Sequence, residues 1–68
     1  MKVTVRFYPS EEKKEVELEG EATGMFLIES LNLNPDSYIL VRSGRPIPID
    51  EELTEGETLT LISVVSGG

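Results

Sequence analysis

The chain has 68 residues and a formal net charge of -7, from 13 acidic and 6 basic side chains, and it contains no cysteine, histidine or tryptophan. Thiolate nucleophiles, Ser-His pairs, disulfides and the usual zinc ligands are therefore excluded, and the fold must rest on packing and backbone hydrogen bonds. The acidic balance argues against a nucleic-acid partner. No long apolar run occurs, so a membrane span is excluded. We expect one small domain, a cytoplasmic monomer with no membrane partner.

The first part of the chain predicts a β-hairpin. Apolar and polar side chains alternate over residues 2–8, which is typical of a strand with one face on the core. The alternation resumes over residues 16–19 and predicts the second strand. Between them lies the charged segment 11–15, and we expect it to be a solvated loop that carries Lys13 and Lys14.

A short helix is predicted next, over residues 23–31. Thr23 can cap it, because its hydroxyl accepts a hydrogen bond from a free amide of the first turn. Phe26 is expected to be partly exposed. Glycine in a helix costs up to about 1 kcal/mol relative to alanine, so Gly24 is expected to weaken it. The helical period places four residues on the core face: Gly24, Leu27, Ile28 and Leu31.

The second half of the chain predicts three more strands. Residues 38–42 are β-branched and aromatic, and the pair 43–44 is expected to form a turn. Two prolines within residues 45–49 remove ladder donors, so this segment is an edge strand at most. An acidic turn follows over 50–56, and residues 58–65 alternate as the last strand.

This order of elements predicts an α+β fold, a mixed sheet of four to five strands with one main helix packed across one face. The connection between the first and last strands is long enough for the crossover that parallel neighbours require, so we place these two strands in the centre. That arrangement is the β-grasp, or ubiquitin-like, fold. We expect a domain over residues 1–65 and a flexible tail over 66–68.

The tail reads Ser66-Gly67-Gly68. Glycine makes up about 7% of average composition, so a terminal pair arises by chance in roughly 0.5% of chains. Glycine has no Cβ, so its backbone adopts extended or turned conformations freely and fits a narrow channel in a partner. The carboxylate that follows Gly67 and Gly68 is then the only group left that chemistry could use.

The predicted strands also offer a docking surface. If Tyr38 and Leu40 face the core, the residues between them face outward, and the same alternation applies to the last strand. Outward aliphatics on neighbouring strands form an apolar patch of the kind that marks interaction sites, although strand propensity alone also places β-branched residues there. The predicted partner-docking patch comprises Ile39, Val41, Ile62 and Val64, with Arg42 at its rim, Ser66 beside it and Arg6 near it.

Three stretches resemble the ThiS and MoaD sulfur carriers and the archaeal small ubiquitin-like modifiers related to them. They are the Thr-led segment 23–31, the Ser-Gly-Arg-Pro-Ile-Pro segment 43–48, and segment 55–68, which ends Val-Val-Ser-Gly-Gly. Such carriers usually have Asn-Gly at the turn, where this chain has Ser43, and an aliphatic residue where it has Gly24. Neither difference affects the tail.

The resemblance implies a protein substrate, not an enzyme. In this family an adenylating activating enzyme uses ATP to activate the terminal carboxylate, here that of Gly68. The adenylate then accepts sulfur from a donor enzyme as a thiocarboxylate, which serves thiazole, molybdopterin or tRNA thiolation, or it is joined to a lysine of a target protein as an isopeptide. Candidate acceptor lysines in this chain are Lys2, Lys13 and Lys14. We assign no catalytic residue, no metal and no bound cofactor.

A different class of function is an alternative. The chain could be a non-conjugated β-grasp interaction module that binds partners through its sheet while the tail is idle. Deleting Gly67 and Gly68 separates the two hypotheses, because a module retains its partner binding and its cellular role without them.

Overall fold

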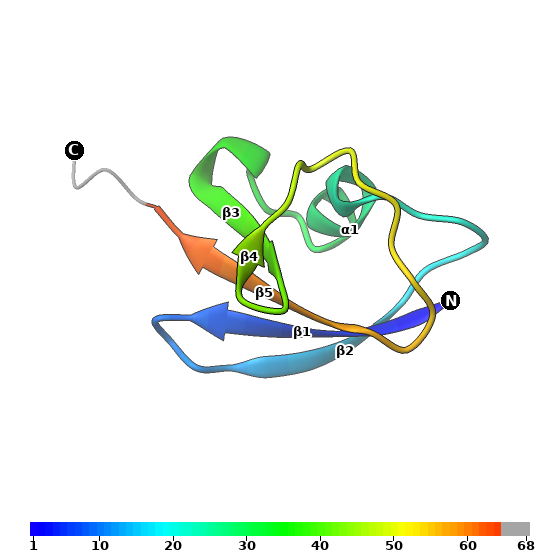
Figure 1. Cartoon of the computed structure of the whole chain (residues 1–68), viewed down its shortest axis with the longest axis horizontal. Coiled ribbons are helices and arrows are strands. Elements are labelled where there is room, and N and C mark those ends of the chain that lie inside the picture. Colours follow the sequence, from blue (N-terminus) through cyan, green and yellow to red (C-terminus); the bar gives the residue numbers. More distant parts are fainter. Residues whose placement is uncertain (65–68) are drawn as a thin grey trace.

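The computed structural model describes residues 1–64, and Figure 1 shows the arrangement of their elements. The strands and helices follow closely on one another, as expected for a short chain with one core. In chain order they are β1 (Lys2–Tyr8), β2 (Lys13–Glu17), α1 (Gly24–Ser30), the 3-10 turn η1 (Pro35–Ser37), β3 (Tyr38–Arg42), β4 (Arg45–Pro46) and β5 (Thr58–Ser63). Among the described residues, neither helical segment has the length and apolar character needed to cross a membrane.

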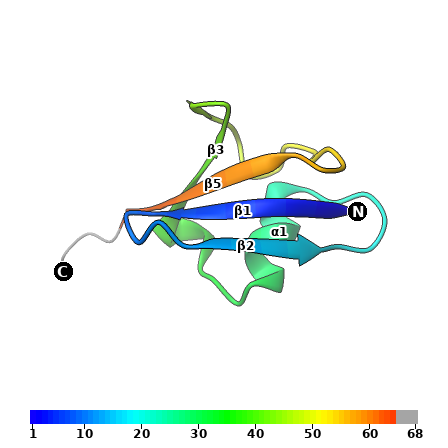
Figure 2. The ribbon, with the colours of Figure 1, turned by 90° about the horizontal axis from the view of Figure 1, so that it is seen from below.

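One five-stranded sheet has the order β2-β1-β5-β3-β4. The central strands β1 and β5 are parallel, and the other neighbours are antiparallel. Helix α1 packs across one face, and Figure 2 looks from the other side, with α1 behind β1 and β2. Parallel neighbours need a long crossover, and the segment from β2 to β5 supplies it. The predicted β-grasp arrangement is confirmed, including its central parallel pair.

The core lies between the sheet and α1. Its most deeply buried side chains come from β1, α1, β3 and β5, as the alternation in these strands and the helical period predict. Each large aliphatic side chain buried here contributes about 1.5–3 kcal/mol relative to exposure. Among residues 1–64, no polar or charged side chain is fully buried. The largest fully buried residues are Leu27, Ile28, Leu40, Leu59, Leu61, Val3 and Val5.

The start of α1 is fixed by a cap and by a close backbone contact. The Thr23 hydroxyl accepts a hydrogen bond from the Phe26 amide at 3.3 Å, which confirms the predicted cap. The Gly24 amide donates to the Glu51 carbonyl at 3.0 Å. A Cβ at Gly24 would lie 2.9 Å from the Ile49 carbonyl oxygen. Glycine therefore allows the loop before β5 to contact the helix. The sequence predicted only that Gly24 weakens the helix and did not predict this contact.

The first hairpin is tighter than predicted. Strand β2 begins at Lys13, and the turn before it is closed by a hydrogen bond from the Phe7 amide to the Glu12 carbonyl at 2.8 Å. Glu11 provides the reversal with a positive φ of 62°. The expectation of a loop over 11–15 is wrong. Residues of an edge strand can all carry charged side chains, because only their backbone groups are needed for the hydrogen bonds to the neighbouring strand.

The turn between β3 and β4 has the form expected of a two-residue hairpin. Ser43 and Gly44 both have positive φ, 51° and 77°, as a type I′ turn requires. Strand β4 covers only two residues of the predicted edge segment 45–49, since Pro46 and Pro48 lack amide donors. Strand β5 ends at Ser63, and the predicted extension to residue 65 lies partly outside the described residues.

Candidate docking face and activation tail

Strand β5 ends beside the turn of the first hairpin. Ile62 of β5 aligns with Tyr8 at the end of β1, because the two strands run parallel. The Val64 amide donates to the Ser37 carbonyl at 2.9 Å and ties the last described residue to η1. The predicted activation residues Gly67 and Gly68, together with Ser66, lie outside the described residues.

An apolar patch occupies the outer face, which is the sheet face opposite α1. Tyr8, Ile62 and Ile39 align across β1, β5 and β3, and Val64 follows two residues after Ile62, just past the end of β5. Tyr8 is 58%, Val64 42% and Ile39 40% exposed, and Ile62 is half-buried. Exposed apolar groups gathered in this way mark an interaction surface. We call Tyr8, Ile39, Ile62 and Val64 the apolar patch; Tyr8 was missed, although alternation over residues 2–8 places it outward.

Val41 belongs to the outer face but not to the exposed patch. Its register partners are Thr60 on β5 and Pro46 on β4, so side chains flank it on both sides. Only 9% of Val41 is exposed. The prediction that Val41 faces solvent is therefore wrong, because alternation assigns a side chain to a face without saying what shields it there.

Arg42 lies on the opposite face from the one that its predicted role requires. It aligns with the buried Leu59, so its side chain shares the face of Leu40 and the core. Its Nε donates to Glu57 Oε1 at 2.7 Å and its Nη2 to Glu57 Oε2 at 2.9 Å. A third bond, from Nη2 to the Glu52 carbonyl, is 2.9 Å long. The prediction of Arg42 at the rim of the docking patch is wrong; it clamps the acidic loop before β5.

The electrostatics of this clamp favour the charged forms of both partners. Burial by itself would raise the pKa of Glu57, but hydrogen bonds from Arg42 and from the Thr54 amide, with the Arg42 charge, lower that pKa below its ordinary value. The hydrogen bond to Glu57 is likewise the largest cause that raises the pKa of Arg42. The network ties the acidic loop to β3. The sequence signal for this position of Arg42 was the alternation along residues 38–42, which puts Arg42 in phase with the buried Leu40.

The three candidate acceptor lysines are all exposed, but they lie on different faces. Lys2 and Lys13 align with Glu17 and Arg6 on the outer face, whereas Lys14 aligns with the buried Val5 and so belongs to the helix side. Each amine is open to solvent, so accessibility does not separate these lysines as acceptors.

A groove that sequence reasoning missed lies at the hairpin end of the molecule. It has a volume of about 760 Å³ and borders both the β1–β2 turn and the end of β5. Its groups are mainly aromatic rings, aliphatic chains and hydroxyls, with one carboxylate and two amines. Its lining residues are Phe7, Tyr8, Pro9, Ser10, Glu12, Lys13, Lys14, Leu31, Leu33, Tyr38 and Ser63.

The described part of the chain offers surfaces for binding. Over residues 1–64 no group of three or more acidic side chains is placed to hold a metal ion. The exposed apolar patch is a surface of the kind that marks interaction sites.

Comparison with known proteins places the chain in a family. The family model of small archaeal modifier protein 2 matches residues 1–65. The chain belongs to this family. It is also 37% identical over 57 residues to the sulfur carrier protein TtuB of Thermus thermophilus, covering 84% of this chain and 88% of TtuB. A protein of Archaeoglobus fulgidus is 35% identical over 69 residues, with all of both chains covered. The family is one of ubiquitin-like modifiers and sulfur carriers.

Solved structures confirm the fold of this small archaeal modifier family member. The crystal structure of SAMP1 from Haloferax volcanii matches with a TM-score of 0.76 at 18% identity, over 100% of each chain. A putative molybdopterin converting factor, subunit 1, from Pyrococcus furiosus matches with a TM-score of 0.76 at 22% identity, over 94% of this chain and 98% of the other. At these identities the likeness concerns the β-grasp fold alone.

Proposed function

We propose that this chain is a ubiquitin-like carrier whose Gly68 carboxylate is adenylated by a partner enzyme at the expense of ATP. The activated end then becomes a thiocarboxylate that donates sulfur, or is joined to a lysine as an isopeptide. The observation that carries the proposal is the family match over residues 1–65, together with the pair Gly67-Gly68 that follows the matched residues. The similarity to a sulfur carrier protein supports the sulfur branch.

The chemistry explains why a partner and ATP are needed. A carboxylate is a poor electrophile, because its negative charge repels nucleophiles. Attack of the Gly68 carboxylate oxygen on the α-phosphorus of ATP releases pyrophosphate and leaves an acyl-adenylate, from which AMP departs readily. Hydrosulfide then replaces AMP and loses its proton to give the thiocarboxylate, or a lysine amine loses its proton and replaces AMP to give the amide. The chain has no cysteine, so any thiol in these steps belongs to a partner.

The fold supports such a substrate role. The apolar patch offers a docking surface at the same end of the sheet where β5 ends, since Ile62 and Val64 belong both to the patch and to the chain that leads to the tail. Figure 1 shows the end of β5 and the β1–β2 turn at the same end of the sheet. A partner that binds the patch would therefore hold the folded domain close to the segment on which it acts.

The test uses the host's adenylating enzyme and ATP. We expect the full chain to support release of pyrophosphate, and intact mass spectrometry to detect an adenylate, or a thiocarboxylate when a sulfur donor is added. The matched controls are a chain lacking Gly67 and Gly68, which is expected to give no product, and Glu19→Gln, a change at an exposed position remote from the tail in sequence. Absence of any product from the full chain would refute the proposal, as would equal activity of the truncated chain.

A further inference from the structure

Two basic side chains lie directly opposite each other on the outer face of the first hairpin. Arg6 of β1 aligns with Lys13 of β2, and both are exposed. The neighbouring pair, Phe7 and Glu12, is hydrogen-bonded through its backbones, so Arg6 and Lys13 form the closer, non-hydrogen-bonded type of pair. Like charges placed directly opposite each other destabilise a sheet.

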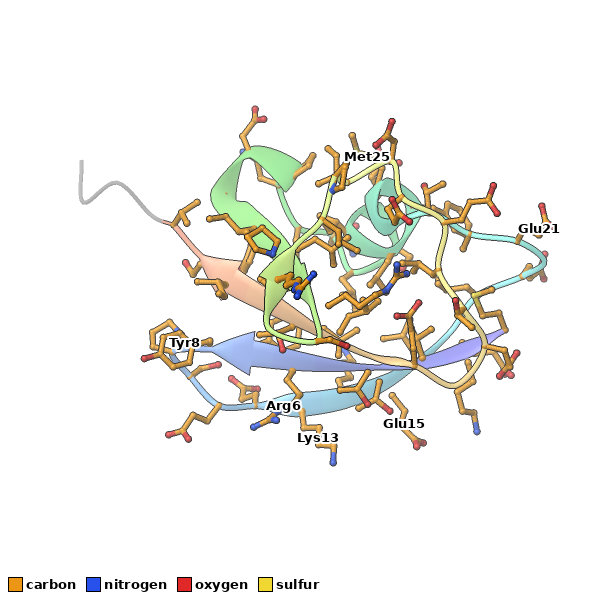
Figure 3. The ribbon with its side chains drawn as sticks, viewed as in Figure 1. Arg6, Tyr8, Lys13, Glu15, Glu21 and Met25 are labelled. Atoms are coloured by element: carbon orange, nitrogen blue, oxygen red, sulfur yellow. The ribbon has the colours of Figure 1, made fainter. Side chains whose placement is uncertain are left out.

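The fold does not compensate this repulsion with an ion pair. Over residues 1–64, the ion pairs formed by acidic side chains involve Arg42 and the N-terminus, and none involves Arg6 or Lys13. Glu15 lies diagonal to Arg6, beyond ion-pair distance. Figure 3 shows the side chains of Arg6 and Lys13 close together at β2, with Glu15 farther along the strand. Within residues 1–64, no ion pair therefore accounts for two opposed cations at this place, in a chain whose net charge is -7.

The cationic pair borders the apolar patch. Arg6 aligns with Thr60 on β5, and Tyr8 aligns with Ile62 two residues farther along each strand, so the two rows are adjacent on the same face. An interface with apolar contacts at its centre and charges at its rim is a common arrangement. A partner that covers the apolar patch would therefore bring its own charged groups close to Arg6 and Lys13.

We propose that Arg6 and Lys13 form a cationic docking site for carboxylates on the activating enzyme's binding surface. The inference rests on the proposed function, because it assumes that this enzyme covers the apolar patch. Carboxylates of the enzyme are attracted by the Arg6–Lys13 pair and repelled by the acidic loop over residues 50–57. Attraction at one place and repulsion at another fix the orientation in which the domain docks.

The test compares two neighbouring lysines of the same strand. Lys13→Glu changes the outer face, and Lys14→Glu makes the same charge change on the helix side. The probe is the host's activating enzyme, and its Kd is measured by calorimetric titration without ATP, so that docking is separated from chemistry. We expect Lys13→Glu to weaken binding about fivefold or more, the size of one exposed charge contact, and Lys14→Glu to change it less than twofold.

A third variant distinguishes docking from a structural role. Arg6→Glu places opposite charges across the pair, so we expect its thermal unfolding midpoint to stay equal or rise while its binding weakens as for Lys13→Glu. Equal effects of the two lysine variants on Kd would overturn the inference, and so would unchanged binding by Arg6→Glu. Wild-type protein that binds without being adenylated would refute the proposed function alone, whereas wild-type protein that does not bind would overturn both.

Discussion

Neutralising Glu57 tests how the loop that leads into β5 is held. In Glu57→Gln the amide oxygen still accepts from the Thr54 amide, but the ion pair with Arg42 is lost and the Arg42 guanidinium keeps only weaker acceptors. The side chains of Arg42 and Glu57 are 28% and 14% exposed, so the pair lies between an exposed pair and a buried one. We expect a loss of about 1–2 kcal/mol in the free energy of unfolding.

In a domain of this size that loss corresponds to a fall of roughly 5–15 °C in Tm. The assay is thermal and urea unfolding at pH 7, with Glu52→Gln as the matched control, because Glu52 contacts Arg42 through its backbone carbonyl. The reasoning is refuted if Glu57→Gln and Glu52→Gln lose the same stability. A double-mutant cycle with Arg42→Met supplies the coupling energy directly, which we expect to account for most of the loss.

The lowered pKa of Glu57 also predicts a pH dependence. Folding lowers the pKa of this carboxyl, so its full contribution to stability is present above its unfolded pKa, whose ordinary value is 4.5. The contribution is lost as the pH falls through the folded pKa. The stability difference between wild type and Glu57→Gln is therefore expected to be constant near neutrality and to shrink below about pH 4.5. Urea unfolding at a series of pH values measures it; a difference that stays constant down to pH 2 contradicts the assignment.

Further substitutions test the helix start, the β3–β4 turn and the docking face. Gly24→Ala is expected to lower stability by about 1–3 kcal/mol despite alanine's better helix propensity, since its Cβ meets the Ile49 carbonyl; a stabilised variant would contradict this. Ser43→Asn, at φ 51°, is expected to raise the unfolding free energy by a few tenths of a kcal/mol, because asparagine tolerates that conformation better, and an unchanged or lower value in urea would argue against strain there. Ile39→Ser, with Thr58→Ser as its control, is expected to raise the KM for adenylation severalfold at unchanged fold, and an unaltered KM would remove Ile39 from the docking face.

Much of the fold is predictable because its signals are local. Alternation over residues 2–8 and 38–42 gives two strands with the bounds that the structure has, and Thr23 marks the start of the helix. Alternation predicts the second strand three residues late, because Lys13 to Glu15 carry no apolar signal and are held only by backbone pairing with β1. Edge strands of this kind are difficult to recognise from side chains alone.

The docking face is predictable in part. Ile39 and Val64 are exposed on the outer face as alternation predicts, whereas the shielding of Val41 depends on neighbouring strands that are distant in sequence. The face on which Arg42 lies can be predicted from the sequence, since Arg42 is in phase with Leu40. That its partner is Glu57 cannot be predicted, because the packing of the loop decides it. The need for Gly24 likewise comes from a contact across the fold.

The activation of the chain end is tested most directly by intact mass spectrometry of the protein isolated from its own cells. Our account predicts a fraction in which one oxygen of the Gly68 carboxylate is replaced by sulfur, or branched peptides that carry Gly68 on a lysine of another protein. A polypeptide that continues past Gly68 in every isolated molecule, or one with an unmodified end in cells whose activating enzyme is active, would contradict it.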